Sequence, residues 1–302
     1  MLTRRSAITF ALLAAWLLPA AAQDRMPVVA SFSILGDIVS NVGGDRVVVK
    51  NLVGPNGDAH VYSPSPADAK TLADAKLIVT NGLGFEGWIG RLIKSSNTKA
   101  PNVVASKGIK PRKLAGSHGH SHGHDHGAGD PHAWQSVPNV KIYVANIRDA
   151  LVAADPAGKA TYEANAAAYL EKLDALDREV KESISKIPPD RRKVITTHDA
   201  FGHFAAAYGV EFVAPQGVST DSEASARDVA RIIQQIKKQK IPAVLLENIS
   251  DQRLLKRIAD ETGAKVGGTL YSDALTDEKG DAPTYIDLIR HNIRALSAAL
   301  MS

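Results

Sequence analysis

The sequence predicts an α/β protein of two lobes, each a mainly parallel sheet flanked by helices, joined by one long rigid helix. Short strand-like runs alternate with helical segments in both halves of the chain, which is typical of parallel sheets covered by helices. A single helical stripe separates the two halves. The 302 residues, 44% of them hydrophobic, suffice for two cores of ordinary domain size.

Runs rich in β-branched residues mark the expected strands, at 28–33, 46–53, 77–82, 193–198, 210–215, 243–248 and 265–272. Segments of helical periodicity lie between them, at 66–75, 85–94, 137–154, 199–208, 225–238 and 251–262. We therefore expect an N-terminal lobe over 27–154 and a C-terminal lobe over 193–302. In parallel sheets of this kind, ligands bind at the carboxyl ends of the strands.

The stripe between the lobes predicts a linking helix over 155–189. Its apolar residues recur every three or four positions, at Tyr162, Ala166, Tyr169, Leu173, Leu176, Val180, Ile184 and Ile187. Asp155 followed by Pro156 favours a helix start, and Pro188 and Pro189 end the pattern. About 32 residues at 1.5 Å each make a rod of about 48 Å, which can tie two lobes together and resist their swinging apart.

Residues 1–22 have the pattern of a secretory signal peptide. Arg4 and Arg5 precede an apolar run over 8–18 that is too short to span a membrane, and small residues stand before Gln23. The chain contains no cysteine, so we expect a periplasmic protein that is neither disulfide-bonded nor lipid-anchored. Without the leader, 34 basic residues face 32 acidic ones, a balance that does not indicate nucleic acid as a partner. We expect a monomer.

The most biased composition lies at 116–127, where five histidines alternate with small or acidic residues: His118, His120, His122, His124 and His126. Nothing apolar is present to pack this segment, so we expect a flexible loop without fixed metal geometry. Two interpretations stay open. The loop is an auxiliary collector that binds metal weakly, or it is a solvated segment whose histidines matter little.

Four further residues are placed where a ligand site is expected. His60 lies in a turn just past the strand at 46–53, His198 closes the strand at 193–198, and Asp273 closes the strand at 265–272. His132 stands shortly before the helical stretch at 137–154. Each half contributes two of the four, so we expect them to converge on the crevice between the lobes. Taken alone, an ordered histidine is more often structural than a ligand.

The segments "GDAHVYSPSPAD", "DPHAW", "THDAFGHFAAAYG" and "GTLYSDAL" together resemble the zinc and manganese solute-binding proteins that serve ABC transporters, of the ZnuA and AztC type. The resemblance covers the whole mature chain, including the histidine-rich loop and the long helix. It implies metal ligands at His60, His132, His198 and Asp273, and a membrane permease as partner. Manganese-type members have Glu where His198 stands, and some zinc members use water where Asp273 stands. The likeness to the AztC type also suggests a periplasmic zinc chaperone as a donor.

The chemistry of these side chains points the same way. Three imidazoles and one carboxylate suit tetrahedral Zn²⁺, whereas Mn²⁺ prefers more oxygen ligands. We therefore expect one tight zinc site and weaker extra equivalents on the loop. Glu247, Asp58 and Asp199 are candidates for groups that orient a ligand, although Glu247 could equally pair with a lysine. His203 and His291 are expected to be packing or surface histidines.

The expected function is high-affinity capture of periplasmic Zn²⁺ and its delivery to an ABC importer, without catalysis. Two alternatives stay open: a manganese-binding member of the same family, and a stand-alone zinc buffer or metallochaperone. A zinc hydrolase is disfavoured because four protein ligands would close the position that a catalytic zinc leaves open. The chain also contains no H-E-x-x-H, G-x-S-x-G or G-x-x-x-x-G-K-[ST] motif.

Overall fold

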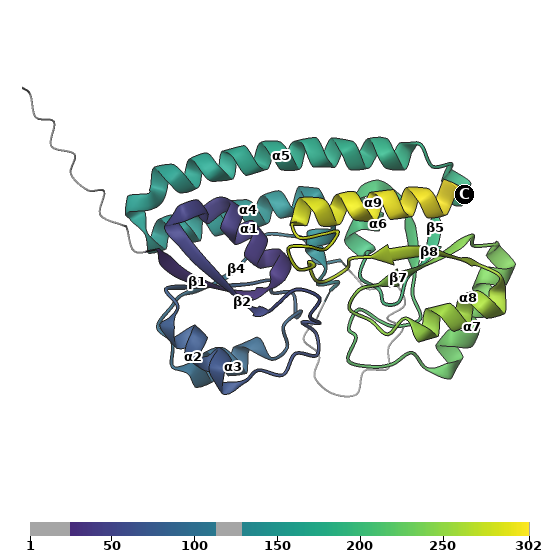
Figure 1. Cartoon of the computed structure of the whole chain (residues 1–302), viewed down its shortest axis with the longest axis horizontal. Helices are drawn as coiled ribbons and strands as arrows, with labels where there is room; N and C mark the ends of the chain where they lie inside the picture. Colours follow the sequence, from purple (N-terminus) through teal and green to yellow (C-terminus); the bar gives the residue numbers. More distant parts are fainter. Residues whose placement is uncertain (1–24, 113–128, 302) are drawn as a thin grey trace, which may run out of the picture.

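The computed structural model describes residues 25–112 and 129–301. Within them the strands form two four-stranded sheets, ordered β2-β1-β3-β4 and β6-β5-β7-β8, and the strand pairings are parallel in both. The two lobes lie side by side beneath one long helix (Figure 1). The predicted fold class is confirmed. The expected signal peptide at 1–22 and the histidine-rich loop at 116–127 lie outside the described residues.

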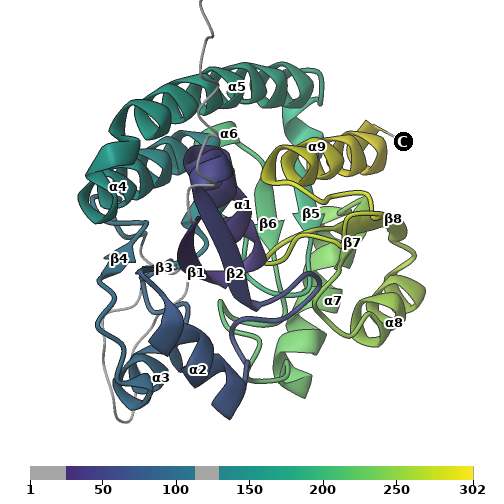
Figure 2. The ribbon, with the colours of Figure 1, turned by 60° about the vertical axis from the view of Figure 1, so that its left-hand side comes forward.

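The N-terminal lobe is built around strand β1, which has a neighbour on each side. Its strands are β1 (Met26–Phe32), β2 (Val47–Val53), β3 (Leu77–Thr80) and β4 (Asn102–Val104). Its helices are α1 (Ser33–Gly43), α2 (Pro66–Asp74), α3 (Ile89–Ser96) and α4 (Val137–Ala154). Helices α1 and α4 cover one face of the sheet, and α2 and α3 cover the other (Figure 2). Both faces of the sheet are thus covered by helices, which is the usual arrangement for parallel strands.

The C-terminal lobe repeats this plan with strands β5 (Lys193–Ile195), β6 (Glu211–Val213), β7 (Ala243–Glu247) and β8 (Lys265–Leu270). Its helices are α6 (Gly202–Tyr208), α7 (Ala226–Gln239), α8 (Arg253–Thr262) and α9 (Tyr285–Met301). Helices α7 and α8 bury their apolar stripes against the sheet in a separate small core. Helix α9 packs against β8 and against the long helix.

The long helix α5 (Lys159–Ser185) joins the two lobes along one side of the molecule (Figure 1). All eight residues of the predicted stripe are buried, so the apolar period faces inward as expected. The helix has 27 residues, about 40 Å at 1.5 Å each. The main hydrophobic core runs without a break from the N-terminal sheet under α5 to α9. This shared core ties the lobes to each other as well as to the helix.

The start of the linking helix differs from the expectation. Residues Pro156–Gly158 form a short 3-10 turn, and the α-helix begins only after it. The Asp155 side chain does not cap the helix. Its Oδ2 accepts hydrogen bonds from Arg46 Nε (2.9 Å) and the Tyr162 hydroxyl (2.7 Å). A guanidinium donor makes a stronger, charge-assisted bond than a backbone N–H, and it is supplied from a distant part of the chain.

Helix α1 and strand β4 were not predicted from the sequence. Helix α1 contains glycines and β-branched residues, which are weak helix formers. Its Gly36 lies against the Asn51 side chain on β2, which would have to move to admit a Cβ at this position. Burial of Ile34, Leu35 and Ile38 stabilises the helix despite its composition. Strand β4 has three residues and is too short to show a period.

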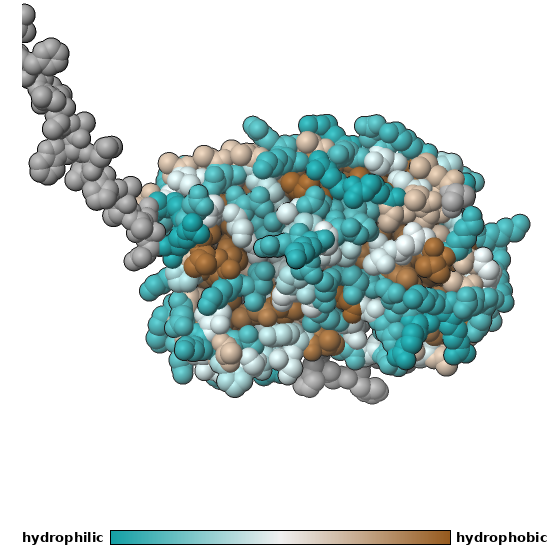
Figure 3. Space-filling view, in the orientation of Figure 1, coloured by the Kyte–Doolittle hydropathy of each residue, from teal (hydrophilic) through white to brown (hydrophobic). Residues whose placement is uncertain are grey.

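No helix in the described ranges, 25–112 and 129–301, is long and apolar enough to cross a membrane. The face of the molecule seen in Figure 3 is mostly hydrophilic, with hydrophobic residues in small separate groups. Such scattered exposure is normal for a folded domain.

Candidate metal centre

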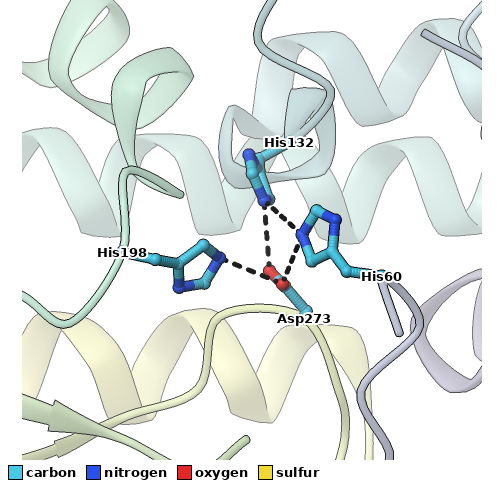
Figure 4. A group of neighbouring side chains, drawn as sticks. All are labelled: His60, His132, His198 and Asp273. Atoms are coloured by element: carbon cyan, nitrogen blue, oxygen red, sulfur yellow. Dashed lines mark hydrogen bonds and ion pairs between the residues drawn. The ribbon is translucent and has the colours of Figure 1, made fainter. Parts of the chain in front are cut away.

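Four side chains, two from each lobe, meet between the two sheets (Figure 4). One ligand atom from each of His60, His132, His198 and Asp273 lies within 4.8 Å of the others. His60 is on the loop after β2, and His132 stands directly before the 3-10 turn (Ala133–Gln135) that leads to α4. His198 and Asp273 follow the carboxyl ends of β5 and β8, as expected for parallel sheets. The structure thus brings together the four residues that the resemblance selects.

The ligand atoms are closely spaced and shielded from solvent. His60 Nε2 lies 3.2 Å from His132 Nε2 and 3.2 Å from Asp273 Oδ2. His198 Nε2 is also 3.2 Å from Asp273 Oδ2, and His132 Nε2 is 3.7 Å from Asp273 Oδ1. Three of the four residues are completely buried, and the His60 side chain is 4% exposed.

Glu247 orients the imidazole of His198. Its Oε2 lies 2.6 Å from His198 Nδ1, and its Oε1 accepts the backbone N–H groups of Thr197 (2.8 Å) and His198 (3.0 Å). Glu247 is fully buried at the end of β7. Its partner is therefore a histidine of the cluster and not a lysine. A carboxylate on Nδ1 leaves the lone pair of Nε2 directed at the centre of the cluster.

Asp130 orients the imidazole of His132 as Glu247 orients that of His198. Asp130 was not identified as a candidate from the sequence. Its Oδ1 lies 2.9 Å from His132 Nδ1 and accepts the His132 backbone N–H at 3.0 Å. The signal was present in "DPH", because an Asp two residues before another residue readily accepts that residue's backbone N–H in an Asx turn. In this turn the carboxylate also meets the imidazole.

Asp58 contacts the His60 backbone and not its ring. Its Oδ1 accepts the His60 N–H at 2.9 Å, and its Oδ2 accepts the hydroxyl of Thr220 from the other lobe at 2.6 Å. The His60 ring packs edge-on against Phe85. Of the three imidazoles, His60 is thus the one whose Nδ1 has no carboxylate partner among the described residues.

Charge coupling within the cluster is strong. Burial lowers the pKa of the His132 imidazole, but the charges of Asp273 and Asp130 outweigh burial and raise that pKa to about 9. Burial also opposes protonation of His198, while Glu247 and Asp273 raise its pKa well above the usual range. Burial favours the neutral form of Asp273, yet the charges of His132 and His198 hold its pKa well below the usual range. In the metal-free protein these shifts favour the charged forms of His132, His198 and Asp273.

The other candidates lie outside the cluster. The Asp199 carboxylate makes no hydrogen bond or ion pair with the four residues in the described part of the chain, and burial raises its pKa. His203 is buried and lies 3.1 Å from the Asp130 carbonyl through Nε2. His291 Nε2 lies 3.0 Å from the Thr269 carbonyl. The histidines at 118–126 lie outside the described residues.

A pair of side chains next to His132 reaches across to the other lobe. Trp134 Nε1 and Gln135 Nε2 both donate to the carbonyl oxygen of Ser272, at 2.9 Å and 2.6 Å. The Trp134 ring packs against His132, Phe32 and Phe85, and its N–H joins the two ligand-bearing segments.

Three imidazole nitrogens and a carboxylate, converging in a buried cluster between two α/β lobes that share one long helix, define a metal-binding protein of the solute-receptor class. The family described as "Zinc-uptake complex component A periplasmic" (ZnuA) matches residues 28–299. The chain belongs to this family of metal-binding substrate-binding proteins of ABC transporters.

Relatives of the chain are named for several metals. It is 36% identical over 279 residues to the "Iron-binding protein YfeA" of Yersinia pestis, covering 92% of this chain and 88% of that protein. It is 34% identical over 278 residues to the "Manganese-binding lipoprotein MntA" of Halalkalibacterium halodurans, covering 92% and 89%. The family resemblance inferred from the sequence is confirmed.

Solved structures of the same fold include the "periplasmic zinc binding protein TroA" from Treponema pallidum. It has a TM-score of 0.82 and 31% identity, over 91% of this chain and 99% of that one. The manganese-bound periplasmic metal-binding protein from Candidatus Liberibacter asiaticus has a TM-score of 0.81 and 32% identity, over 91% and 100%. The shared function is extracytoplasmic binding of a divalent metal for transport, and the metal differs among the relatives.

Proposed function

We propose that this protein captures periplasmic Zn²⁺ at His60, His132, His198 and Asp273 and delivers it to an ABC importer. The observation that carries the proposal is the convergence of three imidazoles and one carboxylate from both lobes in one buried cluster. Glu247 and Asp130 act as the groups that hold two of the imidazoles in the metal-binding orientation.

The donor set supports zinc over manganese. Zinc takes four nitrogen or oxygen ligands at about 2.0–2.2 Å, so the ligand atoms of a tetrahedral site lie about 3.3–3.6 Å apart. The shortest contacts within the cluster, at 3.2 Å, are close to that spacing, and all four ligand atoms lie within 4.8 Å of one another. Manganese favours octahedral oxygen ligands. Further water ligands would have to enter a site whose side chains are almost wholly buried.

The test is replacement of each histidine in turn. We expect His60→Ala, His132→Ala and His198→Ala each to weaken zinc binding at least about tenfold, because each removes one of four ligands. His291→Ala is the matched control, since this histidine contacts the Thr269 carbonyl away from the cluster. Competition with a chromophoric chelator measures the affinities for zinc and manganese. Wild-type protein that prefers manganese would overturn the assignment of zinc.

Members of the family act with a membrane permease and an ATPase. A stand-alone zinc buffer would share the same capture chemistry but would have no such partners. Zinc-loaded protein should stimulate ATP hydrolysis by its permease and ATPase in proteoliposomes, whereas a buffer would leave that rate unchanged. Loaded protein should not hydrolyse ester, peptide or lactam substrates, because four protein ligands leave no open position on the metal.

Several features of the assembly belong to the same proposal. We expect a monomer, and a periplasmic chaperone that donates zinc. Relatives such as MntA are named lipoproteins, but the 302 residues contain no cysteine to which a lipid could be attached. We therefore propose export without lipid anchoring, which fractionation of cells into periplasm and membrane would test.

A further inference from the structure

The peptide bond that joins Ser272 to the ligand Asp273 is held from the opposite lobe. The Ser272 carbonyl accepts two hydrogen bonds, from Trp134 Nε1 at 2.9 Å and from Gln135 Nε2 at 2.6 Å. Trp134, Gln135 and Ser272 are all fully buried. Two short buried bonds on one carbonyl oxygen leave the backbone before Asp273 little freedom to move.

Trp134 and Gln135, the two donors, are held in place by further hydrogen bonds to the segment that carries them. The Trp134 carbonyl accepts the Tyr285 hydroxyl at 2.7 Å, and the Gln135 backbone N–H donates to the His132 carbonyl at 3.1 Å. The Pro131 carbonyl accepts the Asn81 side-chain amide at 3.0 Å. The short segment that carries His132 is therefore a rigid block, and it sets the position of Asp273 across the lobe boundary.

Gln135 makes the fold less stable than an apolar residue would at this position. Its side-chain oxygen Oε1 is buried and has no hydrogen-bond partner among the described residues, which destabilises the fold. An apolar side chain of similar length would avoid that penalty. The benefit of Gln135 is therefore its N–H donor to Ser272.

The position of Asp273 decides how many ligands the site offers. Asp273 Oδ2 lies 3.2 Å from both His60 Nε2 and His198 Nε2, while Oδ1 lies farther out, 3.7 Å from His132 Nε2, and accepts no hydrogen bond from the described residues. Because Oδ1 already faces the cluster, a small shift of the backbone would let it join Oδ2 as a second ligand. Bidentate carboxylate binding raises the oxygen share and the ligand number, which favours manganese over zinc.

We propose that Gln135 is a positioning residue that determines metal specificity; this inference rests on the zinc site proposed above. Together with Trp134, it pins the Ser272 carbonyl so that Asp273 binds metal through one oxygen and the site stays four-coordinate. It thereby selects zinc over manganese without contacting the metal.

The experiment is Gln135→Met in the full chain, which keeps the length of the side chain and removes the donor. Zinc and manganese dissociation constants are measured by competition, and the visible absorption of the Co²⁺-loaded protein reports the ligand number. We expect the preference for zinc over manganese to fall about tenfold or more, with a weaker Co²⁺ absorption as the ligand number rises. Gln235→Met is the matched control, since Gln235 on α7 donates to the Gln239 side chain at 3.4 Å.

A folded Gln135→Met variant with wild-type preference and an unchanged Co²⁺ spectrum would overturn the proposal. If that variant does not fold, Trp134→Phe removes the other donor to the same carbonyl and takes the same test. If the wild-type protein does not bind zinc tightly, the proposed function itself is disproved. If the wild-type protein binds zinc tightly and the variant is unaffected, only the role of Gln135 is disproved.

Discussion

Glu247 Oε2 lies 2.6 Å from His198 Nδ1, and both side chains are completely buried. The N-terminal lobe contains the counterpart, because Asp130 Oδ1 lies 2.9 Å from His132 Nδ1. Each lobe thus supplies one imidazole whose ring orientation is set by a carboxylate. The ring of His60 is positioned by packing against Phe85 and by its loop.

Removing the carboxylate without changing its shape should loosen metal binding. We expect Glu247→Gln and Asp130→Asn each to weaken zinc affinity about 10- to 100-fold, the usual effect of losing a group that orients a ligand. Competition titration measures this effect. Asp149→Asn is the control, since that carboxylate is exposed on α4 and pairs with Arg148 at 2.7 Å. Equal affinities for all three variants would refute the orienting role.

Zinc binding should release protons at neutral pH. Burial lowers the pKa of His132, but Asp273 and Asp130 raise it overall to about 9, and Glu247 and Asp273 raise the pKa of His198 well above its usual range. Both imidazoles are therefore protonated at pH 7 in the metal-free protein, and zinc binds only the neutral form. Affinity should increase as pH rises from 6 towards 9.

The proton count comes from calorimetry at pH 7 in two buffers of different ionisation enthalpy. Asp130→Asn removes one of the charges that raise the pKa of His132, so this variant should release fewer protons than wild type. A binding heat that is the same in both buffers would contradict the prediction.

Asp37 on α1 should make the fold less stable at neutral pH than under mild acid. Its Oδ2 accepts the N–H of Tyr285 at the start of α9, and burial, with a smaller contribution from Asp287, raises its pKa from 3.8 to about 6. Between pH 4 and 6 the folded protein then binds more protons at this site than the unfolded chain. The free energy of unfolding therefore falls as pH rises through that window, by up to about 3 kcal/mol.

Asp37→Asn keeps an acceptor for Tyr285 and removes the charge. We expect it to stabilise the metal-free protein at pH 7 by about 1–3 kcal/mol and to have little effect at pH 4.5. Urea unfolding at both pH values measures the difference. Asp45→Asn, at an exposed carboxylate, is the control and should change stability equally little at both. A variant of Asp37 that is no more stable at pH 7 would disprove the assignment.

Deleting residues 116–127 should leave the tight site intact. The flanks of the loop meet, because the Asp130 N–H donates to the Arg112 carbonyl at 3.0 Å, so the remaining residues can close the gap. Residues 116–127 include no apolar side chain that could pack, so ordering them around a metal ion costs conformational entropy and we expect their sites to be weak. We expect the deletion to remove the weak equivalents and to slow zinc loading in stopped-flow measurements, with the tight dissociation constant nearly unchanged. Loss of tight binding in a folded deletion variant would make the loop part of the primary site.

Local patterns in the sequence predicted most of the architecture. The helical stripe from Tyr162 to Ile187 specified which face of α5 is buried, because a period of three to four residues follows from helix geometry alone. The alternation of strands and helices predicted two parallel sheets for the same reason. It also placed His60, His198 and Asp273 at strand ends, which is where parallel sheets position their ligands.

What surrounds those side chains was decided by the tertiary structure. Glu247 is 49 residues from His198, and Gln135 is 137 residues from Ser272, so nothing in the local sequence specifies either pair. The choice between a histidine and a lysine as the partner of Glu247 was settled by which strand ends meet. Helix α1 also depends on tertiary contacts, since burial of its apolar face against the sheet compensates for weak helix formers. Sequence periodicity determines which face of an element is apolar, whereas the packing of the two lobes determines which polar groups meet between them.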